Sequence, residues 1–164
     1  MRTFFIVVLL VLSIDFLLSF FFLKKTKIWE NDQWQNKYYR IKSDIYHHDL
    51  MPNIDVIEGW GGKLKRQIIT NSIGFRDSAQ KKINKSSDKK RILLIGDSFI
   101  EGSGYDYEYT LAGLLSSKLG NKYEILNSGV ESYSPSIYFK KIQHYMSLGY
   151  KFDQALIFLD LSDI

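Results

Sequence analysis

The segment Arg91-Ile-Leu-Leu-Ile-Gly-Asp-Ser-Phe-Ile-Glu-Gly-Ser-Gly104 decides the expected fold of this chain. Its apolar run from Ile92 to Ile95 predicts a short buried strand, which Gly96 ends. Ser98 follows in a turn between glycines, and a serine at the exit of a buried strand is where an α/β protein presents a nucleophile. The segment therefore predicts an α/β fold with Ser98 as the candidate nucleophile.

Other motifs that place glycine or serine after a strand do not fit this segment. Gly96 and Gly102 are one residue too far apart for the phosphate loop G-x-x-x-x-G-K-[ST], and no lysine follows Gly102. Gly102-Ser-Gly104 lacks the third glycine of a dinucleotide fingerprint, and Ile100 replaces the second glycine of the G-x-S-x-G elbow. A strand followed by Gly-Asp-Ser also occurs by chance in α/β proteins, so a purely structural turn remains the alternative at this point.

The carboxyl half continues as a β-α-β-α-β pattern. Strands are expected at Tyr123–Leu126 and Gln154–Leu159, the second as an unbroken apolar core strand. Helices are expected from about Glu108 to Leu119, and from an N-cap at Ser134-Pro135 to a stop at Gly149. This alternation implies a parallel sheet with right-handed crossovers. The loops after the three strands then meet at one edge, where such sheets bind ligands.

Each expected helix carries an apolar stripe that we expect to face the sheet. The first stripe consists of Leu111, Leu114, Leu115 and Leu119. The second consists of Ile137, Ile142, Tyr145 and Met146.

Three short blocks follow the three predicted strands. They are Ile95-Gly-Asp-Ser-Phe-Ile-Glu-Gly102, Asn127-Ser-Gly-Val130 and Asp160-Leu-Ser-Asp-Ile164. The first two resemble the first two blocks of the GDSL/SGNH hydrolase superfamily, and the third stands where the Gly-x-Asn-Asp block of that family is expected. The resemblance covers Arg91 to Ile164, and it implies a three-layer, flavodoxin-like parallel sheet.

The resemblance also implies the chemistry of a serine esterase that acts on acylated cell-surface glycan or lipid. Ser98 Oγ would attack the ester carbonyl, and the backbone N–H groups of Ser98 and Gly129 would donate to the resulting oxyanion. The family adds an asparagine side chain from the third block, and the matching position here is Ser162, whose hydroxyl is shorter and rotates freely. Asp97 is expected to shape the turn. No metal or cofactor is expected.

The general base of the family is a histidine in a D-x-x-H block beyond the third block, and the sequence ends at Ile164. We therefore expect the front half of an SGNH hydrolase, truncated after its third strand, which would be left as an apolar edge. His144 is expected on a helix surface rather than as a substitute base. Because serine without a base is a weak nucleophile, the alternative function is a catalytically inactive, membrane-anchored binding module. A separately encoded carboxyl-terminal half is a candidate partner.

The amino terminus predicts a transmembrane helix. The run from Phe4 to Leu23 is apolar except for Ser13, Asp15 and Ser19, and at about 1.5 Å per residue it spans a hydrocarbon layer of ~30 Å. Asp15 costs about 3 kcal/mol on the insertion scale, against gains of about 0.3–0.6 kcal/mol for each apolar residue. A cleaved signal peptide is the alternative, but its apolar region would be unusually long and no small-residue cleavage site follows. Residues 1–23 are therefore expected to be an uncleaved anchor, with residues 4–23 in the lipid bilayer.

Two observations point to opposite sides of the membrane as the place where the chain acts. Arg2 precedes the anchor and Lys24, Lys25 and Lys27 follow it, which favours a cytoplasmic carboxyl-terminal domain. Membrane-anchored proteins of the resembling family usually act outside the cytoplasmic membrane. We adopt the second interpretation, a single-pass protein of the cytoplasmic membrane with an extracytoplasmic domain.

Residues 24–90 are expected to form a polar, aromatic-rich stem of short strands and turns before the domain at 91–164. The pair His47 and His48 suggests a metal, but neighbouring side chains in a strand point to opposite faces, and no third ligand is visible at metal spacing. A substrate-contact role for either histidine is retained as a hypothesis. A net charge of +4 without a long basic stripe does not indicate nucleic-acid binding, and the absence of cysteine excludes disulfides.

Overall fold

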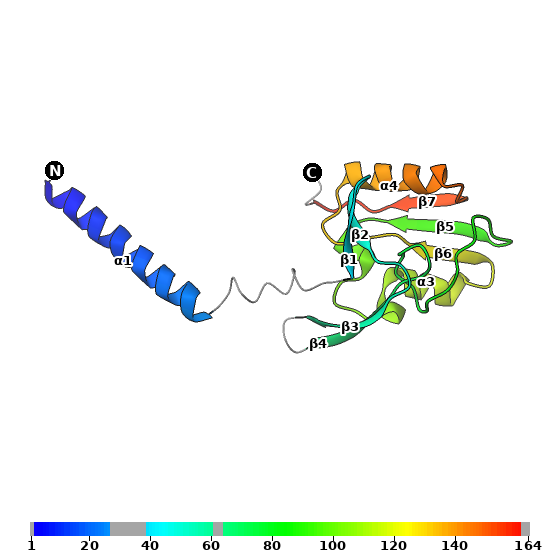
Figure 1. Ribbon diagram of the computed structural model, residues 1–164, viewed down its shortest axis with the longest axis horizontal. Coiled ribbons are helices and arrows are strands. Elements are labelled where there is room, and N and C mark those ends of the chain that lie inside the picture. Colours follow the sequence, from blue (N-terminus) through cyan, green and yellow to red (C-terminus); the bar gives the residue numbers. More distant parts are fainter. Residues whose placement is uncertain (1, 27–38, 61–63, 162–164) are drawn as a thin grey trace. The chain divides into compact units, whose positions relative to one another are not determined.

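The computed structural model describes residues 2–26, 39–60 and 64–161, and these belong to two compact units, Met1–Tyr38 and Tyr39–Ile164 (Figure 1). In the first unit, α1 (Arg2–Thr26) is exposed along its whole apolar length up to Phe22. A helix that is apolar on every side suits a lipid environment. The stretch Arg2–Phe22 is long and apolar enough to cross a membrane.

A three-stranded parallel sheet forms the centre of the second unit. Its strand order is β6 (Tyr123–Asn127), β5 (Lys90–Ile95) and β7 (Gln154–Ile157). β5 pairs in parallel with both neighbours, and Leu93 lies opposite Leu126 on one side and Ala155 on the other. The predicted mixed α/β architecture and its parallel sheet are thereby confirmed.

The two faces of β5 belong to two different clusters of buried side chains. Ile92 and Leu94 pack with Ala112 of α3 (Leu111–Leu119). Leu93 and Ile95 instead pack in the cluster that holds the buried tyrosines of α4 (Pro135–Ser147). This alternation is the period of two that a strand imposes, and it places α3 and α4 on opposite faces of the sheet.

The helix after the first block begins later than predicted. Tyr107–Tyr109 forms a 3-10 turn, η1, and α3 starts afresh after Thr110, whose hydroxyl accepts the Gly113 N–H at 3.1 Å. This N-cap satisfies a helix-end donor and marks the true start of the helix. A Cβ atom at Gly113 would clash with the backbone of Tyr107, so glycine lets α3 pack closely on η1.

The predicted apolar stripes are wrong at three positions. Leu114 and Leu119 of α3 are exposed, as is Met146 of α4. Tyr145 of the predicted stripe is buried, and the other buried residues are Ala112 and Gly113 in α3 and Tyr138 and Lys141 in α4. The physical reason is that α4 buries a face that includes a lysine, and the Asp49 carboxylate binds that lysine. α3 buries the small residues Ala112 and Gly113 rather than its leucines.

The prediction of a buried third strand is also wrong. β7 has four residues, and all of them are exposed, with Leu156 at 41% and Ile157 at 56%. Among the described strands β7 pairs with β5 along one side only, and its side chains stay open to solvent. A strand of apolar residues is buried only where other elements lie over it.

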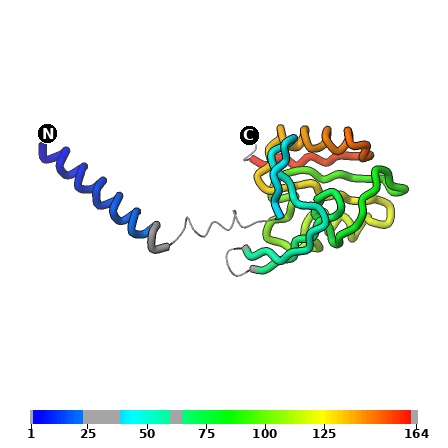
Figure 2. Tube along the Cα trace, viewed as in Figure 1, coloured from blue at the N-terminus to red at the C-terminus, as the bar shows by residue number. Residues whose placement is uncertain are grey.

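Side chains from the described residues between Tyr39 and Ile83 pack in the same cluster as the sheet residue Leu93. These residues contain two antiparallel hairpins, β1 (Arg40–Ser43) with β2 (His47–Leu50), and β3 (Asp55–Trp60) with β4 (Leu64–Ile69). In Figure 2 the cyan segment that contains β1 and β2 runs across the direction of the later strands. The two hairpins and the segments beside them contribute to the cluster around Leu93 the side chains of Tyr39, Tyr46, Leu50, Ile54, Ile68, Ile73, Phe75 and Ile83.

Candidate active site

Ser98 is presented by a tight turn at the end of β5. The turn leads into the short helix α2 (Ser98–Glu101), of which Ser98 is the first residue. The Asp97 carboxylate accepts the Phe99 N–H at 2.9 Å and so caps this helix. Gly102 ends it in the left-handed conformation, with φ of 78°. The prediction that Asp97 shapes the turn is confirmed, and Ser98 is half-buried.

The loops after β5, β6 and β7 meet at one edge of the sheet. Val130 N–H donates to the Gly96 carbonyl at 3.2 Å, and Phe158 N–H donates to the carbonyl of the last residue of β5 at 2.9 Å. Gly129 lies directly against α2, since a Cβ atom there would come within 2.7 Å of the Glu101 nitrogen. The structure thus brings the loops of Ser98 and Gly129 together. Ser162, the third predicted site residue, lies outside the described residues.

Asn127, at the end of β6, ties the Gly129 loop to α2. Its side-chain nitrogen donates to the Ile100 carbonyl at 2.7 Å, and its side-chain oxygen accepts the Gly129 N–H at 3.1 Å. The Gly129 N–H predicted for the oxyanion is therefore already engaged, so a developing oxyanion would have to replace Asn127 as its acceptor. The sequence contained Asn127 in the second block but gave no reason to assign it this role.

A cavity of about 290 Å³ lies next to the turn that carries Ser98. Its walls are apolar, with a carboxylate from each of two loops, and consist of Asp97, Phe99, Ile100, Phe158, Leu159 and Asp160. Apolar walls with a few polar groups are typical of small-molecule sites. The residues that flank Ser98 on both sides thus line a space that suits a small apolar group.

A buried charge cluster lies behind this edge, and sequence reasoning missed it. Arg40 of β1 donates to Glu101 Oε2 at 3.0 Å and Oε1 at 2.6 Å, and to Glu131 Oε2 at 2.9 Å. Glu131 N–H also donates to Glu101 Oε2 at 2.6 Å. Burial by itself disfavours the charged guanidinium, but the charge and hydrogen bonds of Glu101 outweigh that cost and raise the pKa of Arg40.

The two adjacent histidines contact each other, contrary to prediction. His47 has a φ of 84°, and this left-handed backbone breaks the alternation of a regular strand. His48 Nε2 lies 2.7 Å from the Glu131 carbonyl, and the two Nδ1 atoms of the pair lie 2.7 Å apart. Because only an N–H can bind a carbonyl, His48 is protonated on Nε2 and accepts from His47 on Nδ1. Burial lowers the pKa of His48.

The described residues include no group of three histidine, cysteine or acidic side chains arranged to hold a metal ion. Both ring nitrogens of His48 are occupied by the Glu131 carbonyl and by His47. His48 therefore acts in this structure as a contact between β2 and the loop after β6.

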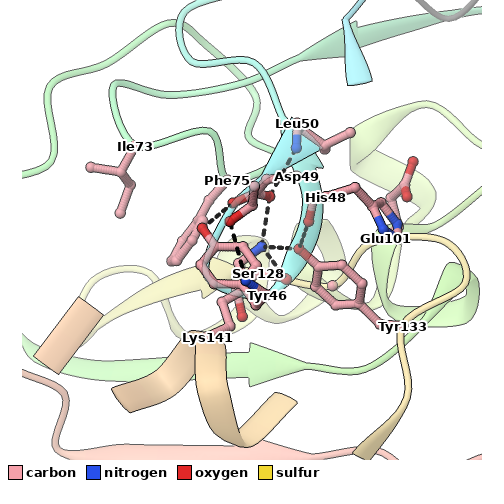
Figure 3. Close-up of polar contacts among 12 residues, drawn as sticks. Tyr46, His48, Asp49, Leu50, Ile73, Phe75, Glu101, Ser128, Tyr133 and Lys141 are labelled. Atoms are coloured by element: carbon pink, nitrogen blue, oxygen red, sulfur yellow. Dashed lines mark hydrogen bonds and ion pairs between the residues drawn. The ribbon is translucent and has the colours of Figure 1, made fainter. Parts of the chain in front are cut away.

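The buried Lys141 of α4 binds the hairpin of β1 and β2 at Asp49 (Figure 3). Lys141 Nζ, on α4, donates to Asp49 Oδ1 at 2.7 Å, to the Ser128 carbonyl at 3.0 Å and to the Tyr133 hydroxyl at 3.1 Å. Burial lowers the pKa of Lys141, although the Asp49 carboxylate opposes this shift. The Tyr133 hydroxyl donates in turn to the His48 carbonyl at 2.6 Å. Lys141 thus joins α4, β2 and the residue just before Gly129.

His144 lies on α4, as predicted, and is half-buried rather than fully on the surface. Its ring lies 5.6 Å from that of Tyr46 and 5.4 Å from that of Tyr145. These contacts are those of a packing residue, and they give His144 no catalytic partner.

No protein-family model matches this chain, and no curated protein matches it. Function is therefore inferred from the residues at this edge of the sheet and from the three sequence blocks.

Proposed function

We propose that this chain carries the nucleophile half of a GDSL/SGNH-type serine esterase, with Ser98 as the nucleophile. The observation that carries the proposal is the position of Ser98. It opens α2 at the edge where the strand ends of a parallel sheet meet, with the Gly129 loop in contact with the same helix. Ligands bind at this edge of open α/β sheets.

In the proposed reaction Ser98 Oγ forms a bond to the carbonyl carbon of an ester, and its proton passes to a general base. The alcohol then leaves, and water releases the acyl group from Ser98. The negative oxygen of the intermediate is stabilised by the N–H groups of Ser98 and Gly129 and by the Ser162 hydroxyl. The cavity of about 290 Å³ beside Asp97 and Phe99 supports a short acyl group as the part of the substrate that is held there.

We assign the general base to polypeptide that covers β7, with a separately encoded carboxyl-terminal half as the candidate. The support is that Leu156 and Ile157 are exposed in a parallel sheet, whereas parallel sheets are generally covered on both faces. We further propose that α1 anchors the chain in the cytoplasmic membrane, that the domain acts outside it, and that the substrate is an acylated glycan or lipid.

A catalytically inactive binding module is the second candidate, and one observation favours it. The Gly129 N–H is bound by Asn127, so one of the two backbone donors is not free for an oxyanion. In that case the same loops would hold an acylated ligand without cleaving it.

The deciding experiment uses the full chain in detergent micelles, together with the separately encoded carboxyl-terminal half that supplies the general base, with a short-chain aryl ester and a fluorophosphonate label. If the chain is an esterase, Ser98→Ala abolishes both turnover and labelling. Ser136→Ala is the matched control, because Ser136 is exposed at the start of α4 and contacts Ser134, and it should leave both unchanged. A folded wild-type chain that shows neither turnover nor labelling in the presence of the carboxyl-terminal half would overturn the esterase proposal and favour the binding module.

A further inference from the structure

One guanidinium joins the two loops that carry the proposed catalytic groups. Glu101 is the last residue of the helix that Ser98 begins, and Glu131 closely follows Gly129. Arg40 comes from β1, far from both in the sequence, and binds both carboxylates. We call Arg40, Glu101 and Glu131 the Arg40 clamp.

Both carboxylates of the clamp are buried and the Arg40 guanidinium is partly buried, so these charges depend on one another. The side chains of Arg40, Glu101 and Glu131 are 14%, 1% and 9% exposed in the two ion pairs. A buried charge whose partner is removed is strongly unfavourable. Without Arg40, two carboxylates would face each other away from water, and they would have to separate or rearrange.

Such a rearrangement would reach Ser98 and Gly129 directly. Gly129 touches α2 at the Glu101 nitrogen, and the Glu131 N–H is bound to Glu101 Oε2. Arg76 fixes the other end of the turn, since its Nη1 donates to the carbonyls of Glu101 and Gly102 at 2.7 Å each. The distance between the Ser98 helix and the Gly129 loop is therefore set by these contacts on Glu101 together with the contacts of Asn127 to Ile100 and Gly129.

We propose that Arg40 is a positioning residue for acyl transfer, which holds Glu101 and Glu131 so that the Ser98 nucleophile and the Gly129 N–H act on the same carbonyl group. The inference rests on the proposed function. Under this proposal β1 contributes to catalysis through Arg40, although it contributes no group that touches the substrate.

The test compares Arg40→Met and Arg40→Lys with Lys42→Met in the full chain, together with the carboxyl-terminal half that supplies the general base. Lys42 lies on the same strand, is 86% exposed at its side chain and pairs with Asp44 at 3.8 Å, so its loss should change nothing. Arg40→Met should lower kcat for the aryl ester by about 100-fold, because small misplacements in an active site cost that much. KM should stay nearly constant. Arg40→Lys keeps the charge but lacks the two-nitrogen fork, so kcat should recover in part.

Amide hydrogen exchange at Glu131 provides a readout that does not depend on activity. Its N–H is bound to Glu101 in the clamp, so exchange should become faster in Arg40→Met and remain unchanged in Lys42→Met. If Arg40→Met does not fold, Glu131→Gln is the second variant, with a smaller loss of kcat expected.

The outcomes separate the two proposals. Absence of Ser98-dependent turnover in the wild-type chain with its carboxyl-terminal half overturns the proposed function and the positioning role of Arg40 with it. An active wild-type chain with unchanged kcat in a folded Arg40→Met variant overturns the positioning role alone. Unchanged Glu131 exchange in that variant overturns the clamp whatever the activity.

Discussion

β6 and β7 flank the same central strand, run parallel to it and carry similar apolar side chains, but their surroundings are opposite. Ile125 and Leu126 of β6 are buried at 4% and 1% exposure, whereas Leu156 and Ile157 of β7 are largely exposed. β6 lies between α3 and the cluster that contains Leu93 and side chains of the two hairpins, and it ends in Asn127, whose side chain binds both Ile100 and Gly129. The difference shows that the burial of a strand depends on what covers it and not on its own composition.

The largest loss of stability is expected when the buried ion pair between Lys141 and Asp49 is broken. Lys141→Met removes the only cation that the structure pairs with Asp49 in the described part of the chain, leaving a carboxylate that is 5% exposed. We expect the free energy of unfolding to fall by about 3–5 kcal/mol. Urea denaturation in detergent micelles measures it. Lys140→Met, one residue earlier on the exposed side of α4, is the control, and an equal loss in both variants would contradict the interpretation.

The next prediction compares the two flanking strands directly. Leu126→Ala in β6 should cost about 2–5 kcal/mol, since it leaves a cavity in a packed core. Leu156→Ala in β7 should cost less than about 1 kcal/mol, as substitutions at exposed sites usually do. Both are measured by the same urea titration. Equal losses would mean that β7 is covered in solution and would remove the difference between the strands.

A smaller effect is expected from pH, through His48. Its pKa in the folded state is lowered by burial, so the unfolded chain binds more protons below the ordinary histidine pKa of about 6.5. Stability should therefore fall as the pH drops from 7.5 to about 5.5. His48→Gln should weaken this dependence in thermal unfolding curves. A steeper dependence in the variant would show that the sign is wrong.

The smallest effect on stability is expected at the edge of β7. Ile157 is 56% exposed, and a lysine on an open strand edge discourages pairing with other chains. Ile157→Lys should change the free energy of unfolding by no more than about 0.5 kcal/mol while reducing self-association in sedimentation velocity. Unchanged self-association would show that β7 is not the surface through which chains associate.

The sequence predicted the elements whose signals are local. Gly96, Asp97 and Ser98 identified the turn after β5, and Ser134-Pro135 identified the start of α4. These features depend on backbone preferences of neighbouring residues, which a sequence displays directly.

What the sequence could not predict depends on residues that are distant in the chain. Arg40 meets Glu101 and Glu131 only because the hairpin packs on the sheet. The stripe predicted for α4 includes Met146 and omits Lys141, because hydrophobic periodicity counts a lysine as exposed. Buried ion pairs have no periodic signal, so charged residues at core positions are where such predictions fail.

The hairpin of β1 and β2 also decides where the protein can be shortened. Arg91, where the three-block resemblance begins, would be the natural first residue of a version without the anchor. Such a protein would lack the partner of both buried glutamates, the carboxylate that faces Lys141, and the side chains that cover Leu93. The shortest version that keeps all the buried side chains of the cluster around Leu93 begins at Tyr39.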